Sequence, residues 1–401
     1  MKKELEGIRM KTKYAAILNL VEDDDKLLPL TRRRPIASLP FACRYRLIDF
    51  PFSSLTNAEV RSAALFISGT GRSLYDHIRS GITWGLDNPT GGGVFTHSQL
   101  ELKSKFDEGR KYSSTYYEDH ANYITRSKAD YVVISGSRIL ANIQIKPMTN
   151  YHLQKQSDIT VAYKKIKRNE LKEDTTYSAY ILESGTNATV KGLEPIKDLP
   201  ADVETIAFGL NFLLAKKEVV LDYLRGLQEN DMPVSVSNIL RLATKRDHVS
   251  INAYEYTGYM KAIEDIRSYF EANMDMLNED NFNALFFRES PVLTKSKNSA
   301  PTYYGKDSVV KHSLLANDSE IYGSVEDSLV SRKNMLCERA SVKNSIILQS
   351  CFIDEDAVIE YAILDKNVYI EKGAKLIGTA ENPLVVPKDA RVLSTGEIVE
   401  G

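Results

Sequence analysis

An aliphatic residue recurs every six positions in the C-terminal part of the chain, and few folds are compatible with such a period. Between residues 321 and 378 the row consists of Leu329, Met335, Ile347, Ile353, Ile359 and, after a shift of one residue, Leu364, Ile370 and Leu376. Ser341 interrupts the row, and we expect its neighbour Val342 to replace it. A six-residue period predicts a parallel β-helix, in which triangular coils stack rows of aliphatic side chains and stabilise one another. A β-sandwich with accidentally regular spacing is the alternative.

The N-terminal part of the chain alternates β-rich segments with helical patterns. Expected strands are Tyr14–Leu20, Ala63–Ile67, Tyr131–Ser135, Ile159–Tyr163 and Thr205–Leu214, and expected helices are Ser73–Ser80, Glu118–Ser127 and Ile263–Leu277. Such alternation predicts a mostly parallel sheet covered by helices, and we expect the last helix to close the first domain. The sequence therefore predicts an α/β domain over residues 1–290 and a β-helix domain over residues 291–401.

Charge and cysteine content exclude several classes of partner. A net charge of -2 gives no general attraction to nucleic acid or anionic membranes. Cys43, Cys337 and Cys351 are odd in number and lack metal-ligand spacing, which favours reduced thiols and a cytoplasmic location. The apolar run Tyr14–Val21 is too short for a membrane span. It is also interrupted by Asn19 and followed by acids, which argues against a signal peptide.

The loop after the first expected strand is acidic where a phosphate-binding turn would need glycine. Glu22, Asp23, Asp24 and Asp25 follow one another without a glycine, and Lys26 comes next. Phosphate loops use bare backbone N–H groups, which glycine leaves accessible. Two like charges at about 4 Å repel by about 1 kcal/mol even in bulk water. We expect this loop to repel a nucleoside triphosphate.

Two arginine-containing segments follow. The run Arg32, Arg33 and Arg34 supplies bidentate donors suited to phosphate or carboxylate, and a solvated charge run is the alternative. Arg44 and Arg46 lie in an apolar loop with Asp49, where an internal ion pair is the simplest interpretation.

Three further polar segments are weaker candidates. Asp76 and His77 near a helix start are interpreted as structural, because nothing nearby supplies a nucleophile. The run Gly91–Gly93 is interpreted as a turn. The strand ending in Ser135 continues with Gly136, Ser137 and Arg138, a position where open α/β sheets bind ligands. Because Ser and Arg offer no carboxylate, no Mg²⁺ site is expected there.

Several long motifs, in order from about residue 13 to about 380, resemble the ADP-glucose pyrophosphorylase (glucose-1-phosphate adenylyltransferase) family. The matching segments are Leu28–Thr31, Pro40–Phe41 with Tyr45–Pro51, Ser73–Ile78, Ser268–Asp275 and Val358–Ile370. The resemblance implies a Rossmann-like, GT-A-like nucleotidyltransferase domain, a left-handed β-helix of hexapeptide repeats, tetrameric assembly and a place in glycogen or starch precursor synthesis.

The departures from this family lie where the chemistry would be. Lys26 occupies the position of the arginine in the family's glycine-rich loop, and Ser68 occupies that of a glutamine that binds adenine. Ile36 and Ala37 occupy the positions of a basic residue and a proline. The two metal-binding aspartates fall on Ser137 and Ala262, and the sugar-phosphate motif is missing around Glu194 and Pro195. Losing about 4 kcal/mol of transition-state stabilisation lowers the rate about a thousandfold, so a chain without these groups is expected to be catalytically inactive. In lacking them, the chain resembles the GlgD-type subunit of Gram-positive bacteria.

These resemblances predict a catalytically degenerate regulatory subunit that binds no cofactor itself and modulates a catalytic glucose-1-phosphate adenylyltransferase partner, which uses Mg²⁺. We expect a hetero-oligomer formed partly through the β-helix. In the family, phosphorylated or acidic effectors bind near the seam between the domains, so the effector-binding candidates are Arg32, Arg33, Arg34, Arg44 and Arg46.

Two alternatives remain. One is an active enzyme that makes ADP-glucose from ATP and glucose 1-phosphate, or a related sugar nucleotidyltransferase, with the acids 22–25 recruiting metal. The other is a hexapeptide acyltransferase, which needs a histidine on the β-helix; only His312 lies near, before the repeats.

Overall fold

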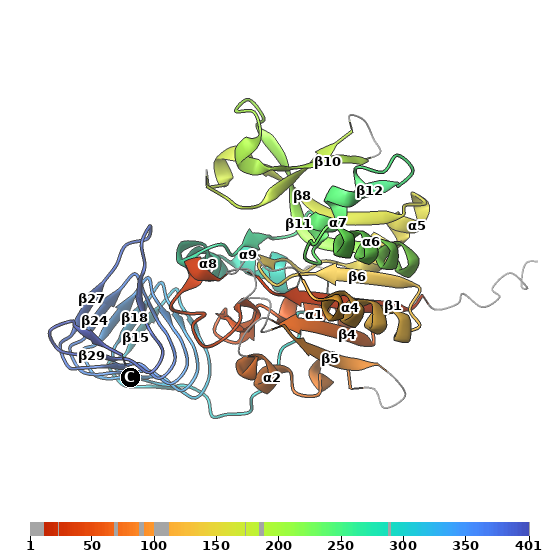
Figure 1. Cartoon of the computed structure of the whole chain (residues 1–401). Coiled ribbons are helices and arrows are strands. Elements are labelled where there is room, and N and C mark those ends of the chain that lie inside the picture. Colours follow the sequence, from red (N-terminus) through yellow and green to blue (C-terminus); the bar gives the residue numbers. More distant parts are fainter. Residues whose placement is uncertain are drawn as a thin grey trace, which may run out of the picture.

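The chain has two parts that pack side by side, an α/β domain and a triangular β-helix (Figure 1). A computed structural model describes residues 12–400 except Asp23, 68–70, 88–91, 100–111, Glu173, 184–187 and 288–289. Asp23, Ser68 and Gly91 of the sequence analysis therefore lie outside the described residues.

A mixed sheet forms the centre of the first domain. Its nine strands in the described part of the chain are β1 (Tyr14–Leu20), β4 (Ser62–Ile67), β5 (Gly93–Ser98), β6 (Tyr131–Ser135), β8 (Ile159–Lys167), β9 (Ser178–Leu182), β10 (Val190–Pro195), β11 (Thr205–Lys216) and β12 (Ile251–Glu255). Neighbours β6, β1, β4 and β5 run parallel, whereas β11 is antiparallel to β6, β8 and β9. The predicted strands are confirmed, Tyr14–Leu20 and Tyr131–Ser135 with their expected bounds and the other three with longer ends. The expectation of a mostly parallel sheet is wrong for the half around β11, because β9, β10 and β11 form antiparallel pairs.

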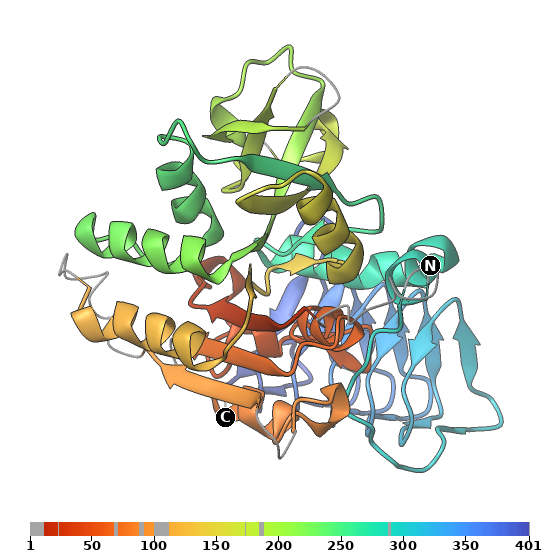
Figure 2. The same ribbon diagram turned by 90° about the vertical axis from the view of Figure 1, so that its right-hand side faces the viewer.

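Helices cover both faces of this sheet (Figure 2). The covering helices are α1 (Asp49–Asn57), α2 (Arg72–Ile78), α4 (Ser114–Arg126), α5 (Ile145–Gln154), α6 (Lys217–Glu229) and α7 (Val236–Ala243), whereas α8 (Ile266–Met274) and α9 (Glu279–Phe286) lie on the side of the β-helix. Short 3-10 helices are η1 (Asp25–Leu27), η2 (Ile36–Ser38), η3 (Ile82–Trp84), η4 (Arg168–Glu170), η5 (Ile196–Asp198) and η6 (Asp275–Leu277). Short strand pairs are β2 (Pro40–Phe41) with β3 (Tyr45–Arg46) and β7 (Ile139–Leu140) with β13 (Lys261–Ala262).

The helix predicted over residues 263–277 is shorter than expected. Asp265 begins α8 with a capping box, in which its carboxylate accepts the Ser268 backbone N–H and the Ser268 hydroxyl accepts the Asp265 N–H. This reciprocal cap satisfies two backbone donors that a helix start leaves open. Ile263 therefore precedes the helix, and η6 ends it at Leu277.

The second domain is the predicted left-handed β-helix. Its strands, each two or three residues long, are β14 (Tyr303–Tyr304), β15 (Val309–Lys311), β16 (Leu314–Leu315), β17 (Glu320–Ile321), β18 (Ser324–Glu326), β19 (Leu329–Val330), β20 (Met335–Leu336), β21 (Ser341–Lys343), β22 (Ile346–Ile347), β23 (Phe352–Ile353), β24 (Val358–Glu360), β25 (Ala362–Leu364), β26 (Tyr369–Ile370), β27 (Lys375–Ile377), β28 (Leu384–Val386), β29 (Arg391–Val392) and β30 (Ile398–Val399). They form three parallel sheets, closed at one end by the antiparallel β29–β30 pair. The coils thus begin before residue 321 and continue past residue 378.

The inner row of the β-helix differs from the prediction at two places. Val342 replaces Ser341 as expected, but Leu336 rather than Met335 and Val330 rather than Leu329 belong to the interior. Leu329 is buried on the outside of the same coil. Paired residues of successive coils are 15 positions apart between β17 and β20 and 17 positions apart between β20 and β23. The spacing therefore departs from a strict six-residue period.

One outer face of the β-helix is buried against the first domain. A single apolar cluster joins residues in and beside α8 and α9 to residues on the outside of the coils: Ile263, Phe270, Met276, Leu285, Phe286, Leu329, Ile346, Leu348 and Ile363. The two domains therefore share a core, and the seam between them is fixed. No helix in the described part of the chain is long and apolar enough to cross a membrane.

Candidate functional site

Glu22 folds inward at the carboxyl end of β1 and is held by the end of β6. Its carboxylate accepts the backbone N–H of Ser137 at 2.8 Å, the Ser137 hydroxyl at 2.6 Å and the backbone N–H of Arg138 at 3.1 Å. Burial raises the pKa of Glu22, against the lowering effect of these donors and of the Arg138 charge. The loop that we expected to repel anions as an exposed acidic run thus directs one of its acids into the protein.

Gly136 makes this approach possible. A Cβ at this position would lie 2.6 Å from Glu22 Oε1 and from Asn211 Nδ2. Such a contact is closer than atoms tolerate, so any other residue would push Glu22 away from the end of β6.

The structure brings position 262 next to position 137. Ala262 in β13 is paired with Ile139 in β7, and Ile263 donates its N–H to the Arg138 carbonyl at 2.8 Å. The Arg138 guanidinium donates to the carbonyls of Ile263 and Glu264 at 3.0 and 2.9 Å. An arginine therefore ties together the two segments at which the family resemblance would place metal-binding aspartates.

The residues at this place do not fit Mg²⁺. Ser137 and Ala262 supply no carboxylate, and both oxygens of the Glu22 carboxylate already accept hydrogen bonds. Across the described residues, no group of three or more His, Cys, Asp or Glu side chains could hold a metal ion. Hard divalent cations need several such oxygens.

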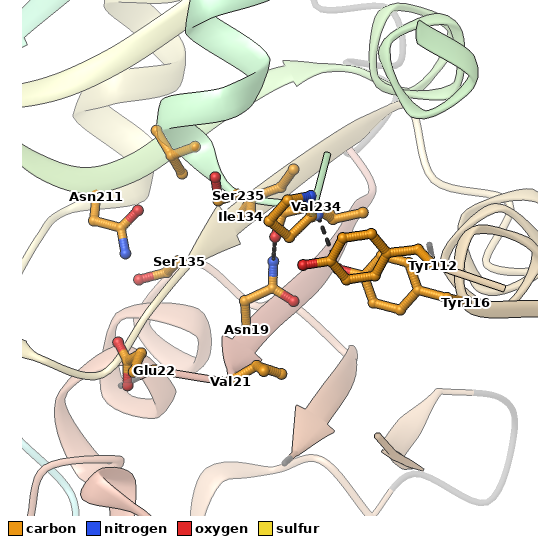
Figure 3. Close-up of a pocket in the computed structure, with 12 residues that line it drawn as sticks. Asn19, Val21, Glu22, Tyr112, Tyr116, Ile134, Ser135, Asn211, Val234 and Ser235 are labelled. Carbon is orange, nitrogen blue, oxygen red and sulfur yellow. Dashed lines mark hydrogen bonds between the residues drawn. The ribbon is translucent and has the colours of Figure 1, made fainter. Parts of the chain in front are cut away.

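A small cavity remains beside Glu22 (Figure 3). It has a volume of about 140 Å³ and lies between the ends of β1 and β6 and the segment that enters α7. The Tyr116 hydroxyl accepts the Val234 N–H at 2.8 Å, and Asn19 donates to the Val234 carbonyl, so this segment is fastened over the strand ends. Ligand pockets usually measure about 300–1,000 Å³, so a nucleotide is too large for this space.

The other described residues of the acidic loop, Asp24, Asp25 and Lys26, make contacts away from Glu22. Asp25 and Lys26 lie in η1, and Lys26 approaches Asp174 at 3.4 Å. The Asp24 carbonyl accepts the Thr31 hydroxyl at 3.2 Å. Neither Asp24 nor Lys26 is placed with Glu22 at the end of β6.

The three consecutive arginines each meet a carboxylate of the β-helix domain. Arg32 contacts Glu400 at 2.6 Å and Arg33 contacts Asp389 at 2.9 Å, on the protein surface. Arg34 pairs with Asp365, where the two side chains are only 5% and 2% exposed. Arg34 is therefore a structural link across the seam, whereas Arg32 and Arg33 stay accessible.

Arg44 and Arg46 do not form the internal ion pair predicted with Asp49. The Arg46 guanidinium donates to the Ser73 carbonyl and to its hydroxyl, while Asp49 accepts the Arg46 backbone N–H at 2.9 Å. The other Asp49 oxygen bonds His77, which is buried and has a lowered pKa because of that burial. The structural interpretation of His77 is thus supported, with Asp49 rather than Asp76 as its partner.

Two basic cavities lie along the seam between the domains. One, of about 690 Å³, is lined by the cationic residues Arg32, Arg33, Arg34, Arg46, Arg72, Lys366 and Lys388, with the acids Asp76, Asp365 and Glu400. The other, of about 530 Å³, is lined by the cationic residues Arg44, Arg46, Lys295, Lys297, Arg332 and Lys366, and by no carboxylate among its described lining. Arg46 and Lys366 border both cavities.

The lysines of the seam show how crowded its positive charge is. Burial, followed by the charges of Arg46 and Arg34, lowers the pKa of Lys366 to about 7. Burial, followed by the charge of Arg332, lowers the pKa of Lys297 to about 8. The Arg332 Nε is buried with no hydrogen-bond partner among the described residues. An anion in this cavity would relieve both the repulsion and the missing bond.

Sequence reasoning missed four cations of the smaller cavity, and Arg72 and Lys388 of the larger one. Lys295, Lys297, Arg332 and Lys366 come from the linker and from separate coils, and their spacing along the chain shows no pattern. The only sequence signal for any of these cations was that Lys366 lies in Val358–Ile370, a segment that matches the family.

Comparison with family models supports the two-domain architecture. Residues 24–177 match the description "Nucleotidyl transferase", and residues 299–383 match "GlmU-like, C-terminal hexapeptide".

The chain is also similar to curated proteins over most of its length. It is 30% identical to "Glycogen biosynthesis protein GlgD" of Bacillus subtilis (strain 168), over 90% of this chain and 92% of that protein. Its identity to the GlgD protein of Geobacillus stearothermophilus is 32%, over 80% of this chain and 81% of that protein. With "Glucose-1-phosphate adenylyltransferase" of Bacillus thuringiensis (strain Al Hakam) it is 24%, over 90% of this chain and 94% of that protein.

Proposed function

Because the chain belongs to the family of GlgD glycogen biosynthesis proteins, which are related to glucose-1-phosphate adenylyltransferases, we propose that it is a catalytically degenerate subunit that regulates an active partner. The observation that carries this proposal is Glu22, whose carboxylate occupies the end of β6 and takes the donors of Ser137 and Arg138. The Glu22 carboxylate repels a negatively charged phosphate. Mg²⁺ is disfavoured because both Glu22 oxygens already accept hydrogen bonds and Ser137 and Ala262 supply no second carboxylate.

Regulation is proposed to act through the seam. Arg44, Arg46 and the lysines of the smaller cavity surround a space without a compensating carboxylate among its described lining. A phosphorylated or acidic metabolite supplies the missing negative charge, and arginine forks bind it by paired charged hydrogen bonds. Arg32 and Arg33 border the neighbouring cavity, so an anion with more than one charged group could contact both.

Contact with the partner is proposed to use the open end of the β-helix. Strands β14, β15 and β16 each begin one of its three sheets and pair on one side only in the described residues. Tyr303, Tyr304 and Val309 on these strands are about half exposed. Unpaired strand edges with apolar side chains are suited to pairing with another chain. A catalytic homologue carries a β-helix of the same kind by family resemblance, so we propose a hetero-oligomer. We place it in the cytosol, since the three cysteines are free thiols.

The test combines activity and assembly. The chain is purified without its partner and incubated with ATP, glucose 1-phosphate and Mg²⁺; we expect no ADP-glucose, and an increase or decrease of partner activity when the two are mixed. Turnover by the chain alone within about a hundredfold of ordinary enzymes, near 10 s⁻¹, would instead support an active adenylyltransferase.

A pair of variants tests the contact. Val309→Lys places a charge on the open end and should weaken co-purification with the catalytic homologue. Ile377→Lys alters an exposed apolar residue of β27, at the other end of the same sheet, and should leave co-purification unchanged. Equal effects of the two would contradict the proposed contact. Deleting the β-helix is a poorer test, because the two domains share a core.

A further inference from the structure

Glu400 is the most weakly held of the three carboxylates that contact the arginine run. Asp365 is buried with Arg34, and Asp389 also accepts Asn367 at 2.8 Å and lies 3.5 Å from Lys388. The described contacts of the Glu400 side chain are limited to Arg32. Arg32 and Glu400 are both more than half exposed, at 52% and 56%.

The segment that carries Glu400 is itself lightly attached. It follows β30, a two-residue strand that pairs only with β29 in the described residues. Val399 of that strand is 44% exposed. The hairpin that connects the two strands is closed by the Leu393 N–H bonding the Glu397 carbonyl at 2.9 Å. Besides this pairing, β30 is held by the contact of half-buried Ile398 with the interior of the β-helix, so few contacts need to break for this segment to move away.

Glu400 also borders the larger seam cavity. It is one of three acids there, among seven cationic residues. Its carboxylate has the chemistry of the anions that an arginine cluster binds, and it takes the Arg32 donor that such an anion would use.

We propose that the hairpin of β29 and β30 is an autoinhibitory element, in which Glu400 occupies Arg32 until a polyanion enters the seam and displaces it. This inference rests on the proposed anion site of the seam and deepens it. Displacement breaks the contact between Glu400 and Arg32 and so releases β30 from the first domain. The surface at this end of the β-helix then differs between the anion-bound and the anion-free chain. An exposed ion pair is a weak competitor, so its removal tightens anion binding by only about two- to five-fold.

Pyrophosphate binding by the full-length chain tests the proposal. Glu400→Gln should lower the dissociation constant about two- to five-fold. Glu397→Gln removes the same charge from the same hairpin, at a residue with no ion pair among the described contacts, and should leave the dissociation constant unchanged. In an Arg32→Gln background, Glu400→Gln should have no effect, because the competition is at Arg32. Pyrophosphate should also speed amide hydrogen exchange in β30 of the unmodified chain.

The inference would be overturned by no difference between Glu400→Gln and the unmodified chain, by the same gain from Glu397→Gln, or by a gain that persists without Arg32. Absence of pyrophosphate binding in both the unmodified chain and Glu400→Gln would overturn it as well. These titrations use the chain alone, so failure of the partner to respond bears on the proposed function and not on this result.

Discussion

Glu22 and Ser137 are joined by two hydrogen bonds, from the backbone N–H and from the hydroxyl of the serine to the one carboxylate. The first residue lies in the loop after β1 and the second at the end of β6, and the parallel pairing of these strands brings the two ends together. A carboxylate of the neighbouring loop therefore lies against the end of β6, where the family resemblance would place an aspartate.

This relationship predicts that restoring one aspartate does not restore activity. Ser137→Asp places a second carboxylate against Glu22 and removes the hydroxyl bond, so we expect no Mg²⁺-dependent ADP-glucose synthesis and a loss of about 2–4 kcal/mol of unfolding free energy. Urea unfolding and a product assay measure the two effects. Ser137→Ala is the control and should cost only about 1–3 kcal/mol. A stable and active Ser137→Asp variant would show that the site accepts metal.

The raised pKa of Glu22 predicts a pH-dependent stability. The folded state binds this proton more tightly than the unfolded state, whose ordinary pKa is 4.5, so the stabilisation is complete below that pH and is lost as the pH rises through the folded value. Glu22→Gln can keep the hydrogen bonds without titrating. The unfolding free energy of the unmodified chain should thus decrease relative to that of Glu22→Gln as pH rises above 4.5.

Urea unfolding of both proteins over a series of pH values measures this difference. Glu229→Gln, at the exposed end of α6, controls for the loss of a negative charge. Parallel curves for Glu22→Gln and the unmodified chain would contradict the prediction.

The buried pair of Arg34 and Asp365 predicts a large loss of stability. Asp365→Asn leaves the Arg34 charge buried without its counterion and should cost about 3–5 kcal/mol of unfolding free energy. Arg32→Ala and Arg33→Ala break exposed pairs and should each cost about 1 kcal/mol or less. Chemical denaturation ranks the three variants, and an equal cost for all would refute the distinction drawn between them.

The lowered pKa values of the seam lysines predict pH-dependent anion binding. Lys366 and Lys297, with pKa values of about 7 and about 8, lose their protons between pH 6 and pH 9, as these values imply. Sulfate keeps its charge over that range, so its affinity should fall by about tenfold or more as pH rises. Calorimetric titration measures this change. The double variant Lys297→Met, Lys366→Met should bind weakly at every pH, whereas Lys388→Met should retain the pH profile; a flat profile in the unmodified chain would contradict the prediction.

The sequence alone was sufficient where structure depends on neighbouring residues. The six-residue period identified the β-helix, because a coil buries side chains at intervals set by the local backbone, and Val342 was recognised as the substitute for Ser341 for the same reason. The strands Tyr14–Leu20 and Tyr131–Ser135 were predicted with their observed bounds. Leu329 and Met335 were assigned to the wrong row, because both residues of their strands are apolar; Leu329 is buried on the outer face of the coil, which the first domain covers.

Only the tertiary structure decided how the charged residues are used. Composition could not distinguish Glu22, which turns inward, from Asp25, which stays on the surface, because the difference lies in the donors that β6 presents. Likewise, the run of three arginines looks uniform, yet Arg34 alone is buried, since Asp365 meets it from the β-helix. These partners are more than a hundred residues apart, and packing of the β-helix against α8 and α9 sets which charges meet. Local sequence patterns carry no record of such contacts.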